Sequence, residues 1–136
     1  MAEILTVPYA LPAFISYLRE AIADKTGETV TVASQVPSVK PAKFIRCLVT
    51  NVNRINLSLA EIVVVCECWA TTEADAGDFA STVYGLASAV NIADPYLYCP
   101  EGSRGTVYGP YPSDDPDSGR PRSVFAVSLR VAVEKI

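Results

Sequence analysis

The sequence predicts an α+β domain, in which a mainly antiparallel sheet of about four to five strands carries two helices packed on one face. Three observations lead to this class. Two stretches repeat apolar residues at helical spacing, several others alternate as strands do, and the strands are clustered along the chain instead of following helices one by one. The 136 residues are 50% hydrophobic, which suits a single domain spanning 1–136 with a real core.

The first helix is predicted for residues 11–27. Pro12 suits the first helical turn, and Gly27, which follows Lys25, is a C-terminal signal. The apolar residues at helical spacing are Leu11, Phe14, Ile15, Leu18 and Ile22.

Three strands are predicted next. Residues 28–37 alternate in part, and residues 42–50 form a second strand with apolar residues on both faces. Residues 51–56 are predicted to turn, because asparagine tolerates left-handed backbone. Residues 60–70 give the strongest strand signal, and their apolar residues on both faces indicate a central strand.

The second helix is predicted for residues 71–92, with Thr72 as its N-cap and acidic residues in its first turns, as the helix dipole prefers. Its apolar stripe consists of Phe79, Val83, Leu86, Ala87 and Val90. Residues 94–112 mix aromatic residues, prolines and glycines, so the strand expected at 105–111 is irregular. Residues 123–135 alternate cleanly and predict a last strand.

The charge distribution argues against nucleic-acid binding, and the length of the apolar runs argues against a membrane span. The net charge is −4, and no lysine or arginine occurs between Arg54 and Arg104. No apolar run reaches the roughly 18 residues of a membrane span. The N-terminus lacks the features of a signal peptide, so the four cysteines are expected as reduced thiols in a cytosol.

Candidate catalytic and metal-binding groups are few. The chain has no histidine, which removes the usual general base and the commonest metal ligand. Cys66 and Cys68 share one face of a predicted strand and could begin a zinc site. A zinc site needs four ligands, and the other two cysteines are far away in sequence, so packing in the core is the favoured interpretation. No cofactor is expected.

Glu67 lies on the opposite face of that strand, beside Trp69. It could act as an acid with a raised pKa, or it could pair with an arginine on a neighbouring strand. Pairing with Arg46 or Arg130 is the favoured interpretation.

Four tyrosines lie close together in the sequence: Tyr96, Tyr98, Tyr108 and Tyr111. They could stack on single-stranded nucleic acid, but that mode needs a basic groove and only Arg104 is near. Contact with another protein is the better use, because tyrosine is a low-entropy interface anchor.

A long hairpin loop is predicted at about 112–122. Its aspartates, Asp114, Asp115 and Asp117, could bind a hard cation, but the spacing fails the calcium-loop pattern, which needs a Glu at the twelfth position. Gly119 is expected to supply positive φ in a turn. About ten residues join two strands where two to five would serve.

The charges of this loop are split between its two limbs, with acids on the first and Arg120 and Arg122 on the second. Identical copies could pair through it, so the loop is expected at an interface. A charge reversal at both arginines is then expected to leave the fold intact and to weaken assembly. The predicted interface, with a neighbouring subunit or a tail-tube protein, comprises Asp114, Asp115, Asp117, Arg120, Arg122, Tyr108 and Tyr111.

Taken in order, several segments resemble the tail terminator (neck) proteins of long-tailed bacteriophages, in the actinobacterial-phage branch. After the opening helix, the segments are VASQVPSVKPAKFIRC, VVVCECWA, the acidic helix start TTEADA, and DDPDSGRPRSVFAVSLRV. The likeness spans nearly the whole chain, and the order and spacing of the segments carry it.

The resemblance implies a non-enzymatic virion protein that forms a ring, typically a hexamer. The ring caps the head-proximal end of the tail tube, ends its polymerisation and joins the tail to the head connector, after assembly in the host cytoplasm. Genomic DNA passes through the ring without specific binding. A rival in the same class is a head-closure or tail-tube protein. A rival from another class is a small metal-dependent enzyme that uses Glu67 and the three loop aspartates.

Overall fold

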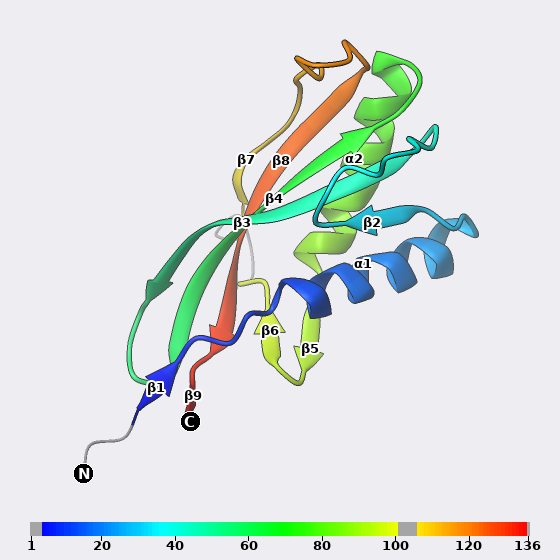
Figure 1. Ribbon diagram of the computed structural model, residues 1–136. Helices are drawn as coiled ribbons and strands as arrows, with labels where there is room; N and C mark the ends of the chain where they lie inside the picture. Colours follow the sequence, from blue (N-terminus) through cyan, green and yellow to red (C-terminus); the bar gives the residue numbers. More distant parts are fainter. Residues whose placement is uncertain (1–3, 101–105, 136) are drawn as a thin grey trace.

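The computed structural model describes residues 4–100 and 106–135, and it shows two helices lying against one side of a long, curled sheet (Figure 1). The helices are α1 (Leu11–Thr26) and α2 (Glu73–Ser88). The strands are β1 (Leu5–Thr6), β2 (Thr31–Ala33), β3 (Phe44–Arg54), β4 (Leu59–Trp69), β5 (Asn91–Ala93), β6 (Tyr96–Tyr98), β7 (Thr106–Pro112), β8 (Arg122–Ala132) and β9 (Glu134–Lys135).

The α+β class is confirmed, but the prediction of about four to five mainly antiparallel strands is wrong. The described residues contain nine strands, and the main sheet has seven, in the order β2-β3-β4-β8-β6-β5 with β7 also paired to β8. The sheet is mixed because β2 runs parallel to β3. β1 and β9 form a separate two-stranded sheet. The missed strands are two or three residues long, too short to show a period of two.

Both predicted helices are confirmed, but α2 ends at Ser88, before the predicted end at residue 92, and Asn91 and Ile92 belong to β5. Gly27 ends α1 in the left-handed conformation with φ of 74°, where glycine has no Cβ penalty. Thr72 caps α2, because its hydroxyl oxygen accepts a hydrogen bond from the Asp75 amide at 3.1 Å. The two helices are joined by the Tyr17 hydroxyl, which donates to the Leu86 carbonyl at 2.7 Å.

The main core lies between these helices and the sheet. Buried side chains from α1 and α2 form one cluster with the residues of β3, β4 and β8 that point to the same side. The fully buried members with the largest side chains include Phe14, Leu18, Ile22, Ile45, Leu97, Phe125 and Leu129. None of the helices in the described part of the chain is long and apolar enough to span a membrane.

The predicted turn at residues 51–56 is largely wrong. β3 continues to Arg54, with a bulge between Val49 and Asn51, and β4 pairs with it along its whole length. A bulge bends a strand and increases its twist, so the two strands curve away from the helices here (Figure 1). We call residues 49–63 the arm.

The hairpin of β7 and β8 is confirmed, although its ladder is irregular. Gly109 explains one irregularity: its φ is 79°, and a Cβ there would lie 2.4 Å from the Val124 carbonyl oxygen. The β5–β6 hairpin was not predicted. Residues 101–105, which include the start of the strand expected at 105–111, lie outside the described residues.

Candidate interaction site

The sheet has a second face that the helices leave uncovered, and we call it the helix-free face. It carries Phe44, Arg46 and Leu48 of β3, Val63, Val65, Glu67 and Trp69 of β4, and Arg122, Val124 and Ala126 of β8. Val65, Val124 and Ala126 form a small buried cluster with Leu48 and Val63 at its margin. The loop between β7 and β8 lies at one end of this face.

Glu67 stands at the centre of a three-residue ion-pair cluster on the helix-free face. Its two carboxylate oxygens lie 2.6 Å from Arg46 Nε and 3.1 Å from Arg122 Nη1. The predicted pairing with Arg46 is therefore confirmed. Arg130 pairs with Glu61 instead, at 3.1 Å, and Arg122 is a partner that the sequence did not indicate.

Arginines cover the aromatic end of the helix-free face. Phe44 and Trp69 stack with ring centroids 4.4 Å apart and are fully buried. The guanidinium of Arg120 lies 5.4 Å from the Phe44 ring, and that of Arg122 lies 5.4 Å from the Trp69 ring. Each arginine thus shields one ring from water and gains a cation–π contact.

Asp115 fixes the shape of the hairpin loop. Its side chain is only 7% exposed. Its carboxylate accepts hydrogen bonds from the Asp117 amide at 2.9 Å, the Ser118 hydroxyl at 3.0 Å and Trp69 Nε1 at 3.2 Å. These donors, the Asp117 amide above all, lower the pKa of Asp115 to about 2.

The rest of the loop is tied to the body by main-chain acceptors. Gly119 adopts a φ of 71°, as predicted, and its amide donates to the Asp115 carbonyl at 2.7 Å. Arg120 Nη2 donates to the carbonyls of Pro41 and Ala42, at 2.9 and 3.2 Å. Arg122 Nε donates to the Ser113 carbonyl at 2.8 Å.

The structure therefore divides the seven predicted interface residues into two groups. Three have partners within the chain and hold the loop on the sheet: Asp115, Arg120 and Arg122. Four lie on the surface: Asp114, Asp117, Tyr108 and Tyr111. The expectation that reversing both arginines leaves the fold intact no longer follows, because each arginine holds the loop in place.

Tyr108 and Tyr111 form an exposed aromatic pair on β7, beside the Glu67 cluster. Their ring centroids are 5.6 Å apart. The pKa of Tyr108 is raised, first by partial burial and then by the Tyr111 and Glu67 charges. Both rings are exposed on the surface, at 39% for Tyr108 and 46% for Tyr111.

Cys66 and Cys68 lie in the main core, as expected for packing residues. Both are free and fully buried, and burial raises the pKa of each thiol. Cys47 Sγ lies 3.7 Å from Cys66 Sγ across the β3–β4 ladder. Among the described residues, no group of three or more acidic or cysteine side chains is placed to hold a metal ion.

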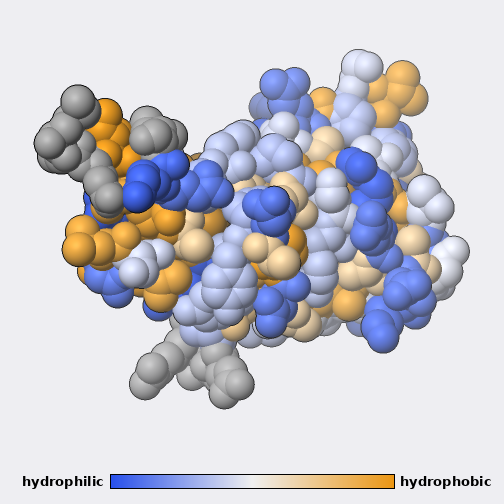
Figure 2. Space-filling view, turned by 90° about the horizontal axis from the view of Figure 1, so that it is seen from below, coloured by the Kyte–Doolittle hydropathy of each residue, from blue (hydrophilic) through white to orange (hydrophobic). Residues whose placement is uncertain are grey.

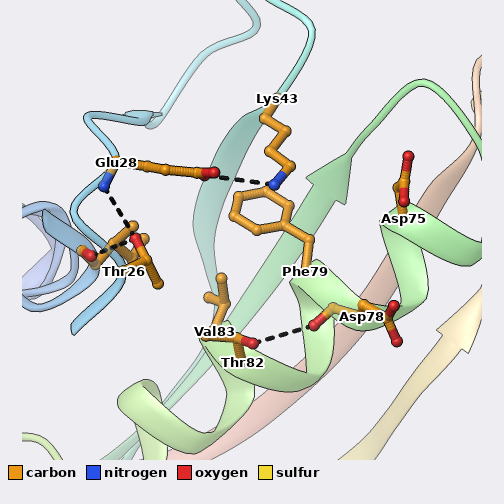
Figure 3. Close-up of a pocket in the computed structure, with 9 residues that line it drawn as sticks. Thr26, Glu28, Lys43, Asp75, Asp78, Phe79, Thr82 and Val83 are labelled. Carbon is orange, nitrogen blue, oxygen red and sulfur yellow. Dashed lines mark hydrogen bonds and ion pairs between the residues drawn. The ribbon is translucent and has the colours of Figure 1, made fainter.

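A pocket of about 270 Å³ opens between the end of α1, the start of β3 and α2 (Figure 3). Phe79 lies in it, with Lys43 Nζ 5.3 Å above its ring and 3.4 Å from Glu28 Oε2. The hydroxyls of Thr26 and Thr82 donate to carbonyls one helical turn earlier. Glu28, Lys43 and the two threonines of the pocket are thus engaged in local structure.

The arm tip is a second surface, and sequence reasoning missed it. Val52, Ile55 and Leu57 are exposed there. A signal was available, because three apolar residues within six positions are unusual in a stretch predicted to turn. Trp69 was also missed as the partner of Asp115, since 46 residues separate the two.

A scan against protein-family models finds no match to this chain, and a search of curated proteins finds none either. The resemblance to tail terminators therefore rests on the segments quoted above.

Proposed function

We propose that the chain is a structural protein of a bacteriophage neck, a tail terminator that assembles into a homo-oligomeric ring. The observation that carries the proposal is the arm. On its β4 side the arm stays paired with β8, and Ala60 and Ile62 are buried in the main core. On its β3 side, no strand within the described residues pairs with the outer edge of β3 beyond Arg46, and apolar side chains are exposed at the tip. Such a surface favours assembly, because a lone molecule leaves it open to water.

The resemblance supplies the kind of assembly. It implies a ring of about six copies on the head-proximal end of the tail tube, in contact with the tube protein on one side and the head connector on the other. The exposed pair Tyr108 and Tyr111, with Asp114 and Asp117 nearby, offers a surface for the tube protein.

The acidic residues support passage of DNA without binding. Glu61 and Glu67 are neutralised by arginines on the helix-free face. Glu73, Asp75 and Asp78 lie exposed at the start of α2. A lumen lined by this helix start would repel a phosphate backbone.

The metal-dependent enzyme is the weaker alternative. Asp115, its central candidate ligand, already accepts hydrogen bonds from two loop groups and from Trp69 of β4, and Glu67 is paired with two arginines. A metal ion would have to displace these partners.

Native mass spectrometry of the purified chain is the first test. A closed ring predicts a discrete species near six times 14.6 kDa. A tail-tube protein would instead give an open-ended series, because its polymerisation does not close. A discrete ring is expected.

The second test adds the chain to polymerising tail-tube protein of the same phage. Negative-stain electron microscopy should show tubes that are shorter and carry a ring at one end. Tubes of unchanged length without rings would contradict the proposal.

A further inference from the structure

We propose that the arm tip of one copy docks in the groove between α1 and α2 of a second copy. This inference rests on the proposed function, because it names the contact through which the ring closes.

The arm tip is a rigid apolar surface. Val52, Ile55 and Leu57 are 51%, 49% and 75% exposed. Figure 2 shows hydrophobic residues gathered at this end of the molecule. A partner that covers them gains the free energy of removing apolar area from water.

The tip is also ordered before it meets a partner. The Asn56 side-chain oxygen accepts hydrogen bonds from the amides of Ser58 and Leu59, at 2.7 and 2.9 Å. The amide of Ile55 donates to the Leu59 carbonyl at 2.9 Å. Because the turn is fixed, docking costs little conformational entropy.

The acceptor is a groove of about 730 Å³ along the helix pair. Tyr17 and Leu86 line it, and their hydrogen bond holds α1 and α2 together. Ala21, Ala23 and Ala89 also line it, and their small side chains leave room for larger ones. The groove is therefore preformed and matches the aliphatic side chains of the tip.

The charges of the two surfaces are complementary. Arg54 is the charged residue of the arm next to the tip, and it is exposed. Glu20 and Asp24 lie one turn apart on α1, on the face that lines the groove, where Lys25 also contributes. Two acids against one lysine leave a net negative rim for Arg54.

The positions of the two surfaces fit a ring. The arm tip lies at the left end of Figure 1, and the C-terminal half of α1 lies at the right end. A copy therefore cannot fill its own groove. Contacts between different surfaces of successive copies are heterologous, and they generate a ring when the rotation closes.

A charge exchange tests the contact. Arg54→Glu and the pair Glu20→Arg/Asp24→Arg should each weaken self-association at least tenfold in sedimentation analysis. Combining all three changes should restore most of the loss. Leu57→Glu should also weaken assembly at least tenfold, without lowering the melting temperature of the monomer.

The controls apply the same chemical changes elsewhere. Val39 and Lys40 lie on the exposed connection between β2 and β3. The variants Val39→Glu and Lys40→Glu should therefore assemble like the parent. If Arg54→Glu and Leu57→Glu assemble as strongly as the parent, the arm contact is overturned. The same holds if the combined variant does not regain assembly. Neither result contradicts the proposed ring. A parent chain that forms no ring, alone or on tubes, overturns the proposed function and the arm contact together.

Discussion

Asp115 shows how one side chain determines what a charged loop can do. Three aspartates within four residues suggest a surface for a cation or a partner. One of them is buried against Trp69 and accepts three hydrogen bonds. Asp115 thus stabilises the loop, and only its neighbours Asp114 and Asp117 are left for contacts outside the chain.

The lowered pKa of Asp115 predicts how stability depends on pH. The ordinary value is 3.8 and the folded value is about 2, so the unfolded chain takes up the proton first. Its contribution is complete above about pH 5 and is lost as the pH falls through 3.8 toward 2. Urea unfolding at a series of pH values should show a steeper acid loss for the parent than for Asp115→Asn.

The matched control is Asp114→Asn, because Asp114 is adjacent and exposed. It should follow the parental pH profile. At pH 7, Asp115→Ala should lower the free energy of unfolding by about 1–3 kcal/mol, since it leaves buried donors without an acceptor. Equal pH profiles for the parent and Asp115→Asn would show that the carboxylate does not hold the loop.

The ion pair of Arg122 with Glu67 is mostly buried, and that of Lys43 with Glu28 is exposed, which gives a second prediction. Arg122→Ala should lower the free energy of unfolding by about 1.5–3 kcal/mol, the range for hydrogen bonds to charged groups. Lys43→Ala, which breaks the exposed pair with Glu28, should cost about 0–1 kcal/mol. Chemical denaturation measures both. A larger loss of stability for Lys43→Ala than for Arg122→Ala would contradict the prediction that the less exposed pair contributes more.

At the scale of elements, the sequence predicts the ends of helices that depend on nearby residues. Thr72 caps its helix, and Gly27 ends the other, because each effect depends on neighbours a few residues away. The β3 extension was missed because asparagines favour turns locally, while the ladder to β4 overrides that preference. Trp69 as a partner of Asp115, and Glu67 as the partner of Arg122, were missed because each pair joins segments that are far apart in the sequence.

The packing of α2 gives a prediction at this scale. Phe79 is buried between the helix and the sheet, so Phe79→Ala should lower the free energy of unfolding by about 3–5 kcal/mol. Thr82→Ala, on the exposed side of the same helix, should change it by about 0.5 kcal/mol at most. Thermal melting compares the two variants. A Phe79→Ala melting curve like that of the parent would contradict this packing.

At the scale of the whole molecule, internal pairing decides which surfaces are left for partners. Arg120 donates to the carbonyls of Pro41 and Ala42, and Arg122 pairs with Glu67 on the helix-free face. The positive charge of the loop therefore has partners within one copy. The arm and the α1–α2 groove are then available for neighbouring copies. The surface of Tyr108, Tyr111, Asp114 and Asp117 is exposed too, and we propose it as the contact with the tail tube.

This division predicts the outcome of two opposite charge reversals in the loop. Asp114→Lys/Asp117→Lys changes exposed side chains and keeps the Asp117 amide that bonds to Asp115, so stability should change by about 0.5 kcal/mol or less. Rings should form, but tube capping should weaken, because reversed charges across an interface cost several kcal/mol.

Arg120→Glu/Arg122→Glu should instead destabilise the monomer, because it places carboxylates beside Glu67 and removes the cover from Phe44 and Trp69. Circular dichroism melting and electron microscopy of rings and tubes separate the two variants. If the aspartate variant caps tubes normally, the loop surface has no part in tube contact. If the arginine variant melts like the parent, the loop is not held by the pairs described above.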